Sequence, residues 1–226
     1  MQAKSGAPPR LLPRAAFARL PADAHPSRPP TRVSQLPLIL ASASPRRADL
    51  LRQLGLGFEI VPSATPEALQ EQLTARELCQ LNAYRKARAV AKQWPDALVL
   101  GADTLVCLGN RLYGKPANLA DAARMLAELQ GRLHQVITGV CLVHLRTHRQ
   151  RLFAAGTDVT FRALDAAGID RYLKQVNPLD KAGAYAIQEH GELIVHEISG
   201  SFSNVVGLPV EQLQVELSAF RAEPAD

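Results

Sequence analysis

Residues 38–51, with the sequence LILASASPRRADLL, predict a strand, a tight turn and a helix. The apolar run 38–41 is typical of a short buried strand. Ser44 is a favourable N-cap residue, and Pro45 suits the first helical position because the N–H it lacks would be unpaired there. Gly55 is expected to end the helix. The stretch therefore predicts a strand that leads the chain directly to a helix N-terminus.

The start of this predicted helix suits the binding of an anion. A helix N-terminus presents free N–H groups, and Arg46 and Arg47 place two guanidinium groups beside them. The hydroxyls of Ser42 and Ser44 belong to the same turn. The alternative is a solvated pair of arginines on an ordinary surface helix, since arginines are mostly exposed. These residues alone favour neither interpretation.

Basic residues are concentrated at the beginning of the 226-residue chain. Residues 1–36 carry six Lys or Arg against one Asp, which equals the whole formal net charge of +5. The remainder carries equal numbers of acidic and basic residues, so no nucleic-acid-binding face is expected on it. We interpret 1–36, rich in Ala, Pro and Arg, as a disordered extension, with a targeting segment or a misassigned start as alternatives. The folded domain is expected over 37–226.

The apolar residues point to a globular protein outside the membrane. No run of about eighteen apolar residues occurs, so no membrane-spanning helix is expected. Cys79, Cys107 and Cys141 have no metal-binding spacing and stand among apolar neighbours. Buried, reduced thiols are therefore expected, which favours a reducing compartment such as the cytoplasm.

Predicted strands and helices alternate in the first half of the domain, and hairpins follow. The predicted strands are 38–41, 58–61, 97–108, 111–113, 135–145, 152–161, 184–188 and 193–198, and the predicted helices lie at 44–54, 74–92, 118–130, 165–175 and from 209 onward. This order predicts an α/β protein with a mixed sheet.

Asp103 is the most informative single residue. It directly follows the apolar run 97–102, where an ionisable carboxylate is costly unless it is paired or binds a metal. The small Gly101 and Ala102 are expected to leave space beside it. The alternative is an aspartate that caps a loop, but 104–107 continues as an apparent strand, which makes a turn less natural.

Three further charged residues are candidates for the same site. Lys86 lies on the predicted helix 74–92, and Lys115 stands between a glycine and a proline, where a mobile ammonium suits a phosphate or a metal ligand. Glu67 lies in a loop with two prolines and could hold a divalent cation together with Asp103. For each of the three, the alternative is an ordinary solvated side chain.

The segment DKAGAYAIQ, residues 180–188, combines small residues with polar ends. Small residues permit the backbone to approach a ligand closely. The amide of Gln188 offers a donor and an acceptor, which match the N3–H and O4 edge of uracil or thymine. The alternative is that Asp180 and Lys181 form a loop ion pair and that Gln188 begins a hairpin turn.

Residues 37–217 resemble the Maf family of nucleoside triphosphate pyrophosphatases. The resemblance rests on six motifs in the family's order: SASPRR at 42–47, GADT at 101–104, GKP at 114–116, TGV at 138–140, DKAGAYAIQ at 180–188 and VVGLP at 205–209. It implies a two-lobed α/β fold, similar to inosine triphosphate pyrophosphatases, with a mixed sheet and flanking helices around a central cleft.

The resemblance also implies a reaction and its residues. A nucleoside triphosphate would be hydrolysed to the monophosphate and pyrophosphate with a divalent cation, Mg²⁺ or Mn²⁺, by a homodimer. The implied roles are proton acceptance by Asp103, substrate choice by Arg46, Thr104 and Gln188, phosphate binding by Ser42, Arg47, Lys86 and Lys115, and metal binding by Asp103 and Glu67.

The segments 187–188 and 203–209 look more like the dTTP/UTP branch of the family than the 7-methyl-GTP branch. A 7-methyl-GTP pyrophosphatase with the same chemistry is the nearest alternative. A non-catalytic nucleotide-binding regulator of cell division is an alternative of another class. The expected partner is the nucleotide itself, with neither nucleic acid nor membrane.

Overall fold

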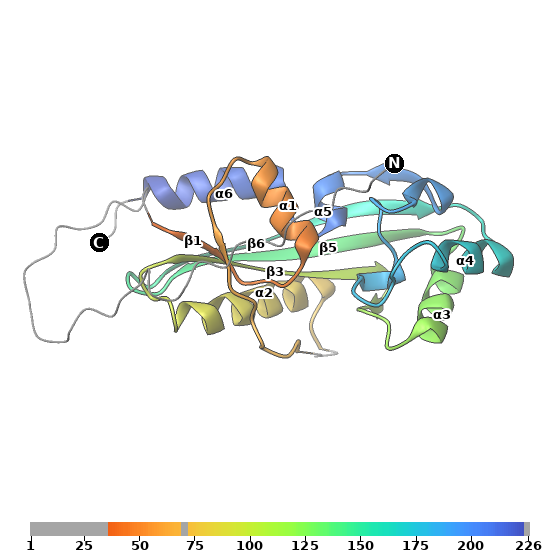
Figure 1. The fold of residues 1–226 in the computed structure, drawn as a ribbon, viewed down its shortest axis with the longest axis horizontal. Coiled ribbons are helices and arrows are strands. Elements are labelled where there is room, and N and C mark those ends of the chain that lie inside the picture. Colours follow the sequence, from red (N-terminus) through yellow and green to blue (C-terminus); the bar gives the residue numbers. More distant parts are fainter. Residues whose placement is uncertain (1–35, 69–71, 224–226) are drawn as a thin grey trace, which may run out of the picture. The chain divides into compact units, whose positions relative to one another are not determined.

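A single mixed sheet runs through the part of the chain that the computed structural model describes, residues 36–68 and 72–223 (Figure 1). Its strands are β1 (Leu38–Leu40), β2 (Glu59–Ile60), β3 (Leu98–Leu108), β4 (Arg111–Tyr113), β5 (Leu133–His144), β6 (Arg149–Phe161) and β7 (Val195–Ser199). The order is β2–β1–β3–β5–β6–β7, with β4 paired to β3. β1 is parallel to β2 and β3, and the other pairs are antiparallel. Apart from Leu36, the predicted extension lies outside the described residues.

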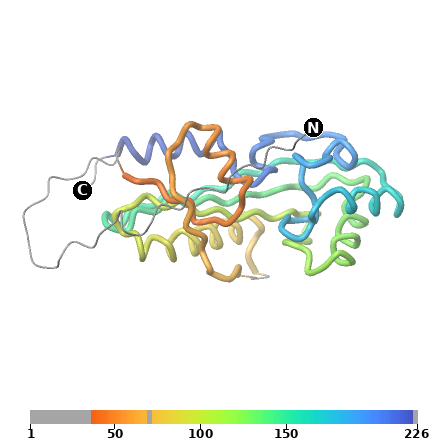
Figure 2. Tube along the Cα trace, viewed as in Figure 1, coloured from red at the N-terminus to blue at the C-terminus, as the bar shows by residue number. Residues whose placement is uncertain are grey.

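Helices cover both faces of this sheet, as the ribbon and the Cα trace show (Figures 1 and 2). They are α1 (Pro45–Gln53), α2 (Ala75–Ala91), α3 (Leu119–Leu129), α4 (Ala166–Leu173), α5 (Phe202–Val206) and α6 (Val210–Ala222), with 3-10 helices η3 (Ala182–Ala184) and η4 (Gly191–Leu193). Helices α1 and α6 lie on one face of the sheet, and α2 lies on the opposite face.

The first core follows from the alternation of side chains along the strands. Leu38 and Leu40 of β1 pack with α1 and α6, whereas Ile39 between them packs with α2. Both faces of β1 are therefore buried, which explains why 38–41 is a continuous apolar run.

A second core lies further along the long strands β3, β5 and β6. Val106, Val136 and Val159 pack there with Leu126 of α3 and Tyr172 of α4. The cluster at α1 and α6 and the cluster at α3 and α4 share one sheet and correspond to the two lobes that were expected. The mixed sheet with helices on both faces confirms the predicted α/β class.

The prediction of a strand over 184–188 is wrong. Ala184 belongs to η3, and the following residues pair with no strand of the sheet. The Tyr172 hydroxyl instead accepts a hydrogen bond from Ala186 N–H at 3.0 Å and donates one to Ala186 O at 3.2 Å. The Tyr172 side chain thus satisfies the N–H and C=O of Ala186, which a neighbouring strand would otherwise pair with. Helix α5 was not predicted, and β7 begins only at Val195 because η4 occupies 191–193.

The predicted helix starts are mostly confirmed. At the predicted starts 74 and 118, Thr74 and Glu77 form a capping box at the beginning of α2, and Asn118 caps α3. Gly55 follows α1 with φ +68°, in the left-handed region that glycine tolerates. Ser44 stands at the N-cap of α1, but its hydroxyl makes no cap hydrogen bond to the helix, and its own N–H donates to Ser42 Oγ at 3.2 Å.

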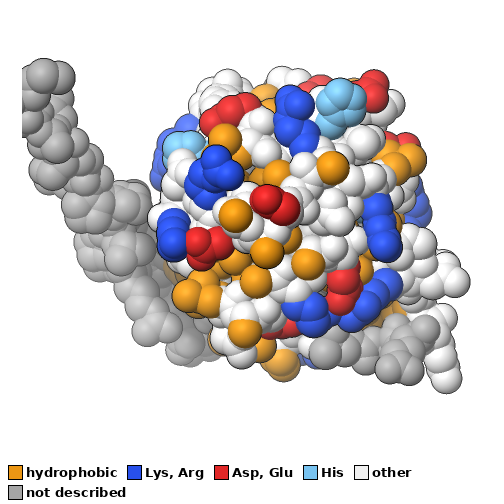
Figure 3. Space-filling model, turned by 90° about the vertical axis from the view of Figure 1, so that its right-hand side faces the viewer, with side chains coloured by type: hydrophobic (Ala, Val, Ile, Leu, Met, Phe, Trp, Pro, Cys, Tyr) orange, Lys and Arg blue, Asp and Glu red, His pale blue; other side chains and the backbone are white. Residues whose placement is uncertain are grey.

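Three further features of the molecule are the state of its cysteines, the character of its helices and the charges on one face. All three cysteines are free and buried, as predicted. Within the described ranges, no helix has the length and apolar character needed to cross a membrane. On the face shown in Figure 3, at the α3 and α4 end, basic and acidic side chains are interspersed.

Candidate functional site

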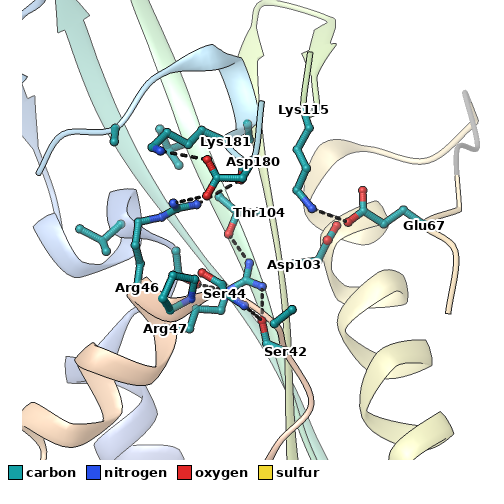
Figure 4. Close-up of a pocket in the computed structure, with 18 of the residues that line it drawn as sticks. Ser42, Ser44, Arg46, Arg47, Glu67, Asp103, Thr104, Lys115, Asp180 and Lys181 are labelled. Carbon is teal, nitrogen blue, oxygen red and sulfur yellow. Dashed lines mark hydrogen bonds and ion pairs between the residues drawn. The ribbon is translucent and has the colours of Figure 1, made fainter. Parts of the chain in front are cut away.

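A cavity of about 510 Å³ opens beside the start of α1, which is a size typical of small-molecule sites. Segments from both lobes line it, including loop 63–67, β3, 180–188 and 205–207. The structure brings all nine residues predicted for the site to this one cavity, namely Ser42, Arg46, Arg47, Glu67, Lys86, Asp103, Thr104, Lys115 and Gln188. Figure 4 labels all of them except Lys86 and Gln188, with Arg46 on one side, Glu67 and Lys115 on the other, and Asp103 between.

Helix α2 approaches the sheet closely at the level of Asp103. A Cβ on Gly101 would lie 2.8 Å from the backbone N of Ala87, and a Cβ on Gly139 would lie 2.5 Å from the backbone O of Cys79. Gly139 is the register partner of Asp103 in the β3–β5 ladder. The space that Gly101 leaves beside Asp103 is therefore occupied by α2 instead of free as expected, while Asp103 itself lines the cavity.

This close approach surrounds Asp103 with polar groups of α2. Lys86 Nζ lies 2.6 Å from Asp103 Oδ1, and Asn82 Nδ2 donates to Oδ2 at 3.2 Å. The aspartate is only 3% exposed. Burial raises its pKa, with the nearby Glu67 charge adding to the effect, and the Lys86 ammonium offsets only part of this. Asp103 is thus a more basic carboxylate than usual, held at both oxygens.

Glu67 joins the same group from loop 63–67. Lys86 Nζ bridges the two carboxylates, with 2.8 Å to Glu67 Oε1. Lys115 Nζ lies 3.9 Å from the same oxygen, as Figure 4 shows. Burial acts to raise the pKa of Glu67, but the Lys86 hydrogen bond and the charges of Lys86, Lys115 and Arg47 lower it overall. Glu67 is therefore an ionised partner for cations at the cavity.

Asn82 is a site residue that the sequence analysis missed. Its Oδ1 accepts from Ala68 N–H at 2.7 Å and its Nδ2 donates to Ala68 O at 3.3 Å, besides the contact with Asp103. It therefore fastens the loop that carries Glu67. Asn82 lies four residues before Lys86, so the two share one face of a helix. That spacing could have indicated Asn82 as a further residue of the site.

Arg47 is fastened to three segments of the protein. Its Nε donates to Gly207 O at 2.8 Å, one terminal nitrogen donates to Ser42 Oγ at 3.2 Å, and the other to Thr104 Oγ1 at 2.9 Å. Burial lowers its pKa, against the charge of Asp103, which raises it. Three of its five N–H groups are used in this way, which leaves two for a ligand.

Arg46 points toward the segment 180–188 instead of being a free cation. It donates to Asp180 Oδ2 at 2.7 Å and to Asp180 O at 3.1 Å (Figure 4). Lys181 Nζ lies 2.9 Å from Asp180 Oδ1, so the alternative of a loop ion pair at these two residues is correct. Gln188, at the end of this segment, lines the cavity and is exposed.

Two carboxylates are the candidate metal ligands. In the described segments, no group of three or more His, Cys, Asp or Glu side chains could hold a metal ion. Mg²⁺ is commonly held by one or two carboxylates, with substrate phosphates and water completing its oxygen ligands. The oxygens of Glu67 and Asp103 fit this pattern.

The family model of Maf-like proteins matches residues 37–220. The chain belongs to the Maf-like family. Curated relatives of this Maf-like chain include proteins named dTTP/UTP pyrophosphatase from Gloeobacter violaceus, 49% identical, and Moorella thermoacetica, 50% identical. Each alignment covers 81% of this chain and 95% or 94% of the relative. A third, from Bacillus velezensis, is 46% identical over 81% of this chain and 96% of its own length.

A solved nucleoside-triphosphatase / dITP/XTP pyrophosphatase from Mycobacterium abscessus shares 18% identity with the Maf-like chain. The match covers 57% of this chain and 76% of that one, with a TM-score of 0.39. The fold assignment therefore rests on the sheet order and on the family match.

Proposed function

We propose that this Maf-like chain hydrolyses dTTP and UTP to the nucleoside monophosphate and pyrophosphate, and so clears nucleotides from the cellular pool. The observation that carries the proposal is the buried carboxylate of Asp103, which faces a nucleotide-sized cavity lined with cationic side chains. The names of the relatives support the choice of dTTP and UTP.

The triphosphate would bind at the start of α1. The hydroxyl of the N-cap residue Ser44 makes no hydrogen bond to the first N–H groups of this helix, which leaves them available for an anion. Ser42, Arg47, Lys86 and Lys115 line the same cavity and would share the negative charge of the phosphates. Such positioning and charge stabilisation supply most of the catalysis in phosphoryl transfer.

Asp103 would act as the general base. It takes a proton from a water molecule whose oxygen forms a bond to the α-phosphorus, and the bond from this phosphorus to the bridging oxygen breaks to release pyrophosphate. A raised pKa suits this role because a stronger base accepts the proton more readily. Asn82 and Lys86 hold the carboxylate in place.

A divalent cation, Mg²⁺ or Mn²⁺, is part of the proposal. Glu67 and Asp103 would hold it together with phosphate oxygens of the substrate. When bound, it would neutralise charge on the phosphates. Lys86, which bridges both carboxylates, would then share their negative charge with the metal.

The base of the nucleotide would be recognised by Gln188, with Arg46 and Thr104 nearby in the cavity. The Gln188 amide can donate to O4 and accept from N3–H of uracil or thymine. The guanine of 7-methyl-GTP is a larger, cationic ring with an amino group beside its N1–H, so the surroundings of Gln188 are where we expect the two substrate classes to be distinguished.

The test is pyrophosphate release by the full chain from dTTP, UTP, CTP, ATP, GTP and 7-methyl-GTP with Mg²⁺ or Mn²⁺. We expect dTTP and UTP to be the best substrates and Asp103→Asn to lower kcat by roughly 10²–10⁴-fold. The control is Asp170→Asn, which changes an exposed carboxylate on α4. Nucleotide binding without pyrophosphate release would favour a regulator, and full activity of Asp103→Asn would remove this residue from the mechanism.

A further inference from the structure

The Arg46–Asp180 pair connects the two sides of the cavity. Arg46 stands in the first turn of α1, and Asp180 lies 134 residues later, just before η3. Two hydrogen bonds join them, one to the carboxylate and one to the backbone carbonyl. The Arg46 side chain is 19% exposed, so the pair is partly shielded from water, which strengthens it.

Asp180 is itself held by a buried cation. Lys181 is 5% exposed, and its Nζ lies 2.9 Å from Asp180 Oδ1, 2.7 Å from Asn177 O and 3.3 Å from Glu189 Oε2. A buried ammonium needs such partners, so its position is fixed by them. One Asp180 oxygen thus binds Lys181 and the other binds Arg46 (Figure 4).

The segment that carries Asp180 and Gln188 is anchored between these two residues. Tyr172 binds both backbone groups of Ala186, and the Tyr185 hydroxyl lies 2.9 Å from His134 Nε2. These anchors come from α4 and β5, outside the segment itself. Because Arg46 is bound to Asp180, it is held against the same anchored segment that carries Gln188.

We propose that Asp180 is a positioning residue that holds the Arg46 guanidinium against the segment carrying Gln188 and thereby sets which nucleotide base the cavity accepts. This inference rests on the proposed function of the site. Without Asp180, Arg46 would lose its anionic partner and be free to turn toward the phosphates, which are the same in every nucleoside triphosphate. Asp180 thus directs Arg46 toward discrimination between bases instead of general phosphate binding.

The test is a double-mutant cycle of Asp180→Ala and Arg46→Ala, read as the ratio of kcat/KM for dTTP to that for 7-methyl-GTP. We expect Asp180→Ala alone to lower this ratio about tenfold and to change it less than about twofold when Arg46 is already alanine. Asp180→Asn keeps an oxygen for Lys181 but removes the charge that binds Arg46, so it should lower the ratio as well. It also guards against loss of folding in the alanine variant.

The matched control is Asp96→Asn, which weakens the exposed pair between Asp96 and Arg146 outside the cavity and should leave the ratio unchanged. Equal effects of Asp180→Ala in both Arg46 backgrounds would overturn the inference while leaving the proposed reaction intact. Dissociation constants for α,β-imido analogues of dTTP and 7-methyl-GTP give the same ratio without hydrolysis. A chain that releases no pyrophosphate but shows this coupling in binding would overturn the reaction and support the role of Asp180; no nucleotide binding would overturn both.

Discussion

Two opposing effects act on the pKa of Asp103. Burial at 3% exposure disfavours its charged form, and the Lys86 ammonium at 2.6 Å favours it. Burial prevails, so the pKa of Asp103 is raised. A general base must be deprotonated to act. The fall of activity at low pH, the acid limb of the pH–activity profile, should therefore follow the protonation of Asp103.

Replacement of Lys86 by methionine should move that acid limb to higher pH. Loss of the ammonium removes an effect that lowers the Asp103 pKa, so the pKa rises further and a higher pH is needed for the carboxylate form. The measurement is kcat/KM for dTTP as a function of pH. Lys115→Met is the control, because this lysine contacts Glu67 and not Asp103, and it should lower activity without moving the limb. An unmoved limb in Lys86→Met would contradict the assignment of the base.

Helix α2 is the element that assembles the reactive centre. Asn82 and Lys86 lie on one of its faces, and both reach Asp103 because Gly101 and Gly139 let the helix backbone lie against β3 and β5. Ala83 and Ala87 of the same helix pack into the core beneath. Gly101 and Gly139 thus contribute to the site by letting α2 approach, although neither lines the cavity.

The substitution Gly139→Ala should push α2 away from the sheet. Its Cβ would lie 2.5 Å from the Cys79 backbone O, which cannot turn aside as a side chain could. Overpacking of this kind costs about 1–3 kcal/mol, measured as the free energy of unfolding in urea. Because Lys86 and Asn82 move with α2, kcat should fall too. Gly57→Ala, with no atom within 4 Å of the new Cβ, should change stability by less than about 0.5 kcal/mol; an equal loss there would refute this explanation.

In the described part of the chain, several apolar clusters share one sheet, and segments that belong to different clusters line the cavity. Arg46 and Arg47 of α1 cross to Asp180 and to Gly207, respectively, so polar contacts join segments that pack in different places. In the second core, His134 is 3% exposed and packs against Phe161 and Tyr185. Burial lowers the pKa of His134 to about 4.

This buried histidine should make the free energy of unfolding depend on pH. The unfolded chain binds a proton at His134 below about pH 6.5, whereas the folded chain does so only below about 4, so stability falls as the pH drops between these values. The loss attributable to His134 should reach about 3 kcal/mol by pH 4. Urea unfolding at several pH values measures it. The slope should decrease in His134→Gln and persist in His196→Gln, which changes an exposed residue of β7; an unchanged slope in the first variant would contradict the prediction.

Much of the fold was predictable because its signals are local. The capping box of Thr74 and Glu77 and the hairpin at 111–113 involve residues a few positions apart, and both are present. The strand over 184–188 was not predictable in this way. Its sequence is compatible with a strand, but the partner of its backbone is the Tyr172 hydroxyl, which comes from a separate helix.

The α/β class, the family and nine of the polar residues that line the cavity follow from the amino-acid sequence, because apolar periodicity and six short motifs are properties of the chain alone. The contact of Asn82 with Asp103 and that of Arg46 with Asp180 become apparent only once the chain is folded. These contacts depend on strand register and on how closely α2 can approach the sheet. Both arise from packing between distant segments, which no local pattern of residues specifies.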